Sequence, residues 1–159
     1  MSWGELLAAA PEFAAGVRGR LDAHVHKTIA TIRRDGSPRI SGVETFWAED
    51  ELWFGSMPNA VKAGDLQRDP RYALHSGFDD PPDWHGDCKL AGVAVELTEP
   101  ERRLELFRTR GEDPPSPESH LFRMVIAEAA LVSLNDTRDR LVVQSWRFGV
   151  PGVRRLVRE

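Results

Sequence analysis

The chain has 159 residues, of which 41% are hydrophobic and 29% are charged, with a formal net charge of -4. This length and composition predict one soluble globular domain with a hydrophobic core of its own. The acidic balance argues against general nucleic-acid binding, which needs a basic surface.

The first 22 residues are predicted to form helices. One helix begins near Trp3, and Pro11 ends or restarts it. In the stretch 12–22, apolar residues recur at every fourth position and so share one helical face: Phe13, Val17 and Leu21. No basic segment precedes this alanine-rich start, and no apolar run approaches the roughly 18 residues of a membrane helix. We therefore expect a cytoplasmic protein that makes no membrane contact.

Strands are predicted from about residue 26 onward. The segments 27–33 and 39–47 are rich in β-branched and aromatic residues and flank Asp35-Gly36, which is the pattern of a hairpin. The acidic residues 49–51 turn the chain into a third strand, Leu52–Ser56. These three strands are expected to form an antiparallel meander.

The segment Ser56–Lys62 is the best clue to function. The third strand ends at Ser56, and Asn59 is expected to cap a helix whose third residue is Lys62. A hydroxyl, the free N–H groups of a helix start and a cation would then converge, which suits an anionic group such as a phosphate. Arg39 lies nearby and adds a cation. The alternative is an ordinary helix start with a surface lysine, because many helices begin with asparagine.

The remaining sequence predicts more strands and few helices. The segment 121–134 is ambiguous, because Ala127–Ala130 favours a helix while its β-branched flanks favour a strand, and a hairpin with 141–146 fits best. The other expected elements are a strand at 71–76, an acidic proline-rich loop at 77–86, a strand at 90–97 and a helix from Pro100. Six or seven strands in total indicate an antiparallel barrel or closed sheet. We expect a single domain over residues 1–159, with helices at about 3–22 and the barrel at about 26–148.

No self-contained catalytic machinery is evident. No histidine pair has the spacing of a zinc site, so no metal is predicted, although His24 or His26 could lie at a cofactor edge. Cys88 is interpreted as a small buried side chain rather than a nucleophile. Since no nucleophile triad or glycine-rich phosphate loop is present, the pattern suggests that an organic cofactor carries the chemistry.

In order and spacing, these motifs resemble the pyridoxamine 5'-phosphate oxidase-like, flavin-binding split β-barrel family. The resemblance covers about residues 27–155 and rests on five segments in order: Ala30–Arg39, Leu52–Ser56, Lys62–Leu74, Gly86–Gly92 and Ser145–Arg147. It implies a mainly β (α+β) fold, a six- to seven-stranded antiparallel split β-barrel with a few flanking helices.

In such proteins FMN lies at a homodimer interface. The resemblance implies that Ser56 and Lys62 contact the FMN phosphate, with Arg39 as a helper and Asn59 at the helix start. It also implies that the second strand lines the isoalloxazine ring through Ser41, Val43, Glu44 and Thr45. Lys89 and Trp146 would come from the partner subunit.

One departure from the family pattern bears on the cofactor. Many FMN-binding relatives have a polar pair such as Ser-Arg just before the lysine, where this chain has Ala60-Val61. The change removes a charge-assisted contact worth about 1.5–3 kcal/mol, or roughly tenfold or more in affinity. FMN is the expected cofactor, and the alternatives are a deazaflavin coenzyme of the F-420 type or an empty site.

The resemblance implies an oxidoreductase that transfers a hydride between the flavin and a small organic substrate. The alternatives are a deazaflavin-dependent reductase on the same fold, and a non-catalytic cofactor-binding or cofactor-free dimeric protein. Neither the substrate nor a catalytic residue is assigned.

Overall fold

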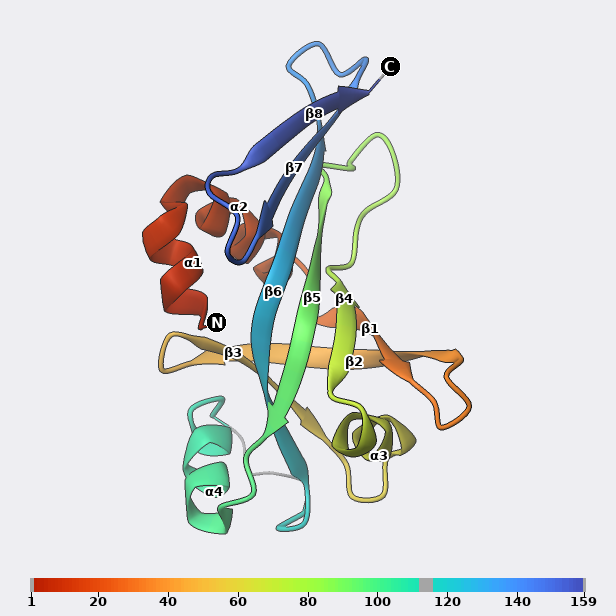
Figure 1. Ribbon diagram of the computed structural model, residues 1–159, viewed down its shortest axis with the longest axis vertical. Coiled ribbons are helices and arrows are strands. Elements are labelled where there is room, and N and C mark those ends of the chain that lie inside the picture. Colours follow the sequence, from red (N-terminus) through yellow and green to blue (C-terminus); the bar gives the residue numbers. More distant parts are fainter. Residues whose placement is uncertain (1, 112–115, 159) are drawn as a thin grey trace.

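The computed structural model describes residues 2–111 and 116–158. Within these ranges the strands form one antiparallel sheet in the order β3-β2-β1-β4-β5-β6-β7-β8, and an additional β3–β6 pairing closes the first six into a barrel (Figure 1). The barrel strands are β1 (His26–Ile32), β2 (Pro38–Ala48), β3 (Glu51–Ser56), β4 (Arg71–His75), β5 (Asp87–Glu96) and β6 (His120–Leu134). The predicted mainly β barrel with flanking helices is confirmed.

The long strand β6 settles the ambiguous segment. It pairs with β5 on one side and with β7 (Leu141–Arg147) on the other, so Ala127–Ala130 is strand despite its local helical preference. Ladder hydrogen bonds to two neighbours outweigh the small propensity difference. The last strand, β8 (Arg154–Arg158), pairs only with β7 and was not predicted. All five of its residues are exposed, so it lacks the alternation by which a half-buried strand is recognised in sequence.

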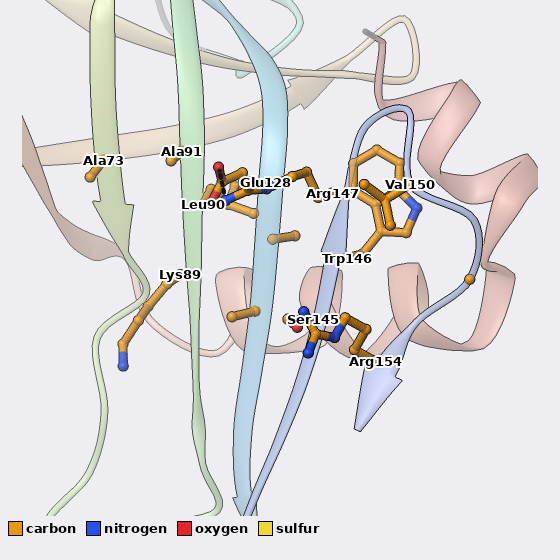
Figure 2. A pocket seen from close by; sticks show the side chains of 13 residues that line it. Ala73, Lys89, Leu90, Ala91, Glu128, Ser145, Trp146, Arg147, Val150 and Arg154 are labelled. Carbon is orange, nitrogen blue, oxygen red and sulfur yellow. Dashed lines mark ion pairs between the residues drawn. The ribbon is translucent and has the colours of Figure 1, made fainter. Parts of the chain in front are cut away.

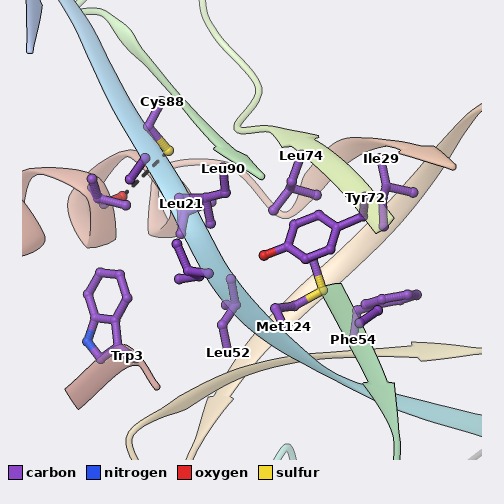
Figure 3. Packing of buried hydrophobic residues seen from close by; sticks show 14 of the residues in the cluster. Trp3, Leu21, Ile29, Leu52, Phe54, Tyr72, Leu74, Cys88, Leu90 and Met124 are labelled. Carbon is purple, nitrogen blue, oxygen red and sulfur yellow. Dashed lines mark hydrogen bonds between the residues drawn. The ribbon is translucent and has the colours of Figure 1, made fainter. Parts of the chain in front are cut away.

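Two helices at the start of the chain, α1 (Trp3–Ala9) and α2 (Pro11–Asp22), pack beside the barrel. The Ser2 hydroxyl accepts a hydrogen bond from the Glu5 N–H, and the Glu5 carboxylate accepts one from the Ser2 N–H, a capping box. The predicted apolar face of α2 is buried, and Trp3 and Leu21 join the barrel core (Figure 3). Burying a large apolar side chain is worth roughly 1.5–3 kcal/mol, so this contact fixes the helices on the barrel.

The remaining helices, α3 (Val61–Arg68) and α4 (Pro100–Arg108), lie at the other end of the molecule (Figure 1). The expectation that Asn59 caps α3 is wrong, because Ala60 is the N-cap and makes no side-chain cap hydrogen bond. Asn59 instead has a φ of 60°, a turn conformation that asparagine tolerates, within a turn closed by the Ala60 N–H on the Met57 carbonyl oxygen. Lys62 is therefore the second helical residue rather than the third, and it still lies in the first turn.

Among the described residues, no helix combines the length and apolarity that crossing a bilayer requires. The cytoplasmic location expected from the sequence stays a prediction.

Candidate functional site

A cavity of about 390 Å³ lies where β2 and β3 meet the start of α3 and the end of α4. We call it the β3–α3 cavity. Strand β2 contributes Val43 and Glu44, the end of β3 contributes Ser56, and α3 contributes Lys62. The cavity thus brings together four of the residues predicted for cofactor binding.

Two buried hydroxyls in this cavity have no hydrogen-bond partner among the described residues. The exposed fraction is 6% for Ser56 and 1% for Ser119, and both residues line the cavity. The β3–β6 ladder pairs Ser56 with His120, which places Ser119 on the neighbouring chain segment. A buried polar group without a hydrogen-bond partner costs about 1–3 kcal/mol of stability. A polar ligand atom that bonds to either hydroxyl would therefore recover that cost. This donor set fits the phosphate of a flavin nucleotide.

The charges around the cavity differ between its parts. Lys62 forms no ion pair with any described residue and lines the cavity near the free N–H groups of α3. The Glu44 carboxylate lies 3.2 Å from the Arg110 guanidinium and 3.5 Å from the His26 ring. Arg110 also lies over the ring of Phe46, 5.2 Å from its centroid. Since Arg110 already pairs with Glu44, Lys62 leaves the lining of the cavity with a net positive charge.

Sequence reasoning missed Ser119 and Arg110. Neither stands in a recognisable motif, because Arg110 follows α4 in a turn and Ser119 precedes β6 in a loop. Close packing brings them to the site: a Cβ added at Gly55 would lie 2.8 Å from the Phe107 ring, so the end of α4 presses directly against β3. In the sequence, the only local sign of this close contact is Gly55, a glycine within the third strand.

Arg39, the predicted phosphate helper, is engaged elsewhere. Its Nε donates to Asp65 Oδ2 at 2.7 Å, and the same carboxylate accepts hydrogen bonds from Thr31 and Arg68 at 3.0 Å each. Burial raises the pKa of Asp65, but the hydrogen bonds from Arg39, Arg68 and Thr31 outweigh it and hold that pKa below the usual value. Asp65 is one helical turn beyond Lys62, so this network anchors α3 to β1 and β2 and fixes where Lys62 lies.

A second concave surface, the β5–β7 cleft, has a volume of about 530 Å³. Lys89 on β5 and Trp146 on β7 both line it (Figure 2). Trp146 is only 5% exposed, so most of its ring belongs to the core and one edge borders the cleft. Arg147 pairs with Glu128 at 2.8 Å, and Arg154 forms no ion pair among the described residues. The two residues predicted to come from a partner subunit are therefore together, away from the β3–α3 cavity.

The predicted site residues thus divide into three groups. Four line the β3–α3 cavity and two line the β5–β7 cleft, while the rest line neither: Arg39, Ser41, Thr45 and Asn59. Along β2, Ser41 and Thr45 share a face with the buried Val43, whereas Glu44 points to the opposite face. A cofactor role for each of the ten stays a prediction.

Cys88 and the histidines offer no competing centre in the described ranges. Cys88 is fully buried, and burial raises the pKa of its thiol to about 12, far from the value of a reactive thiolate. No three His, Cys, Asp or Glu side chains within the described residues group as a metal site would require.

Comparisons with known proteins agree with this fold. The model of the family described as pyridoxamine 5'-phosphate oxidase matches residues 15–133. No curated protein matches the chain.

Several solved structures share the architecture. PhzG from Burkholderia lata 383, in complex with tetrahydrophenazine-1-carboxylic acid, is 12% identical with a TM-score of 0.69, over 98% of this chain and 92% of that one. A pyridoxamine 5'-phosphate oxidase-related, FMN-binding protein from Nostoc punctiforme is 12% identical with a TM-score of 0.64, over 94% and 96%. A protein described as an F420 reductase is 18% identical with a TM-score of 0.57, over 72% and 95%. At these identities the likeness establishes the fold.

Proposed function

The chain belongs to the pyridoxamine 5'-phosphate oxidase family, and on that premise we propose that it is an FMN-binding oxidoreductase acting on a small organic substrate. One observation carries the proposal. The β3–α3 cavity combines a lysine at a helix start with two buried hydroxyls, and none of the three has a hydrogen-bond or ion-pair partner in the described part of the chain. The FMN-binding neighbour from Nostoc punctiforme, which has the same fold, supports FMN as the occupant.

The protein's own residues bind and orient the cofactor in this proposal. Ser56 donates a hydrogen bond to the phosphate, and Lys62 supplies a charge to it near the first N–H groups of α3. Val43 and Glu44 on β2 line the same cavity and would contact the rest of the cofactor. When bound, FMN supplies the hydride-transfer chemistry. The Asp65 network holds α3 in place and so fixes the backbone from which Lys62 would hold the phosphate.

We further propose that the site is completed by a second copy of the chain. On the outer face of the barrel, Ile40, Ala30, Ala73 and Ala91 are successive cross-strand partners on β2, β1, β4 and β5. Ile40 is 74% exposed, and the row ends at the β5–β7 cleft, which Ala73 and Ala91 line.

Such a row of apolar side chains, beginning on the strand that also lines the cavity and ending at the cleft, suits a twofold homodimer. In a dimer of this kind, Lys89 and Trp146 of one subunit would face the cavity of the other.

A deazaflavin-dependent reductase is the second candidate. The neighbour described as an F420 reductase has the same fold. Val61, which is 61% exposed at the first position of α3, provides no polar side chain to the phosphate where many FMN-binding relatives have a polar residue. Weaker binding of the phosphate would lower the affinity for FMN relative to the affinity for the deazaflavin.

The test begins with the absorbance spectrum of the protein as purified, followed by titration with FMN and with the deazaflavin coenzyme. Lys62→Ala is expected to weaken FMN binding about tenfold or more, because it removes a charge-assisted contact. The control for the loss of one positive charge is Arg155→Ala, because Arg155 is exposed on β8. Lys27→Ala would not serve as this control, because Lys27 is buried. Equal FMN affinity of wild type and Lys62→Ala would remove Lys62 from the site, and no binding of either coenzyme would reject the proposal.

A further inference from the structure

We propose that Ser119 is a ligand of the cofactor's terminal phosphate and forms, with Ser56, a two-hydroxyl clamp across the β3–β6 ladder. The inference rests on the proposed function, because it assigns a further contact in the same cavity. Neither the motifs of the third strand nor those of α3 include this residue.

Burial and the absence of a partner carry the first step. Ser119 is 1% exposed, its Oγ contacts no hydrogen-bonding group of the described residues, and it lines the β3–α3 cavity. A structural serine at this depth would bond to the backbone, as Ser76 does through Gly77 and Cys88. The hydroxyl of Ser119 therefore makes no hydrogen bond that would give it a structural role within residues 2–111 and 116–158.

The second step is the position of Ser119 relative to Ser56. Ser56 is the cross-strand partner of His120, so residue 119 precedes the ladder position that faces Ser56. Both hydroxyls are buried and lack a partner among the described residues, and the two serines line one cavity. Because a serine hydroxyl rotates freely, each can donate to a different oxygen of one phosphate.

The third step is that the described residues on either side of Ser119 are held by hydrogen bonds. The Ser119 N–H donates to the Ser116 carbonyl oxygen at 3.0 Å, and Arg103 donates to the Pro117 carbonyl oxygen at 2.7 Å. On the far side, the Leu97 N–H donates to the Leu121 carbonyl oxygen at 2.8 Å. A ligand that binds Ser119 thus incurs little of the ordering cost of a mobile loop.

The fourth step concerns the charge of the ligand. Lys62 gives the cavity a positive charge, and the Glu44 carboxylate is offset by the Arg110 guanidinium. A phosphate monoester offers three terminal oxygens, enough for two hydroxyls and one ammonium group. The arrangement selects a terminal phosphate as the group that Ser119 binds.

The experiment compares two flavins that differ only in the phosphate. FMN and riboflavin are titrated, by flavin fluorescence, into wild type, Ser119→Ala, Ser56→Ala and a control, Ser133→Ala, whose side chain lies in β6 away from the cavity. Ser119→Ala should weaken FMN binding about tenfold and leave riboflavin binding within about twofold, because only FMN carries the lost hydrogen-bond partner. Ser56→Ala should show the same selectivity, and Ser133→Ala should change neither affinity.

The thermal midpoint of the ligand-free protein provides a readout that a structural role would alter. Removing a buried hydroxyl that has no partner should not lower it, so a destabilised or misfolded Ser119→Ala protein would contradict the inference. Unchanged FMN affinity, or equal loss for FMN and riboflavin, would also overturn it while leaving the proposed function intact. A wild-type protein that binds neither flavin would reject the proposed function, and the inference with it.

Discussion

Replacing Asp65 by asparagine removes a negative charge from a buried carboxylate that three side chains share. Asp65 is 4% exposed and accepts hydrogen bonds from Thr31, Arg39 and Arg68. Asparagine has nearly the same shape, so the change creates no cavity. It leaves two guanidinium groups without a counterion and turns an NH₂ group toward donors.

The size of the effect follows from the burial of the partners. Removing one member of a buried ion pair costs about 3–5 kcal/mol. The Arg39 and Arg68 side chains are 26% and 35% exposed, so water partly solvates the charges left behind. We therefore expect Asp65→Asn to lower the free energy of unfolding by about 3 kcal/mol, the lower end of that range. For a domain of this size, that corresponds to a fall of about 6–12 °C in the thermal midpoint.

The assay is urea denaturation at neutral pH, with the slope of the transition checked for constancy. Asp69→Asn is the matched control, because Asp69 pairs with the largely exposed Arg71 just after the same helix, and its loss should leave the midpoint unchanged. A loss below about 1 kcal/mol for Asp65→Asn would refute the view that this network anchors α3.

The pH dependence provides a second check on the same residue. The folded-state pKa of Asp65 lies below its ordinary value of 3.8, so its contribution is present above that value and is lost as the pH falls through the lower, folded pKa. The stability gap between wild type and Asp65→Asn should therefore persist from neutral pH down to about pH 4 and narrow below it. A gap that widens with acid would contradict the assignment of a depressed pKa.

Two further predictions concern the sheet and its outer face. A Cβ at Gly92 would lie 1.9 Å from the Val125 carbonyl oxygen, at a register shift between β5 and β6. Gly92→Ala should therefore lower the free energy of unfolding, measured by urea denaturation, by about 3 kcal/mol or more. Gly64→Ala is the control and should be tolerated, because a Cβ at Gly64 meets no atom within 4 Å. Ala73→Arg places a charge in the apolar row of the proposed dimer and should convert a dimer to a monomer in sedimentation velocity, with circular dichroism unchanged. A wild-type monomer, or a variant that stays dimeric, would refute the proposed interface.

Much of the fold could be predicted because its signals are local. The hairpin around Asp35-Gly36, the strand that ends at Ser56 and the short helix containing Lys62 follow from turn residues, β-branched runs and helix breakers. The same local pattern located the polar end of the β3–α3 cavity, which contains Ser56 and Lys62. The exact helix start was wrong by one residue, since Asn59 extends the preceding turn instead of capping α3.

The sequence by itself determined the strands of the barrel and the segment Ser56–Lys62, because strand alternation and turn chemistry depend on neighbours along the chain. Only the tertiary structure decided how the sheet closes and which distant side chains meet. The β3–β6 ladder places His120 opposite Ser56, so that Ser119 lines the same cavity as Ser56, and Arg39 bonds to Asp65 instead of the cavity. These outcomes depend on residues far apart in the chain: the register of β3 against β6, and the choice of Arg39 between Asp65 and a ligand. No periodicity in the sequence can therefore predict them.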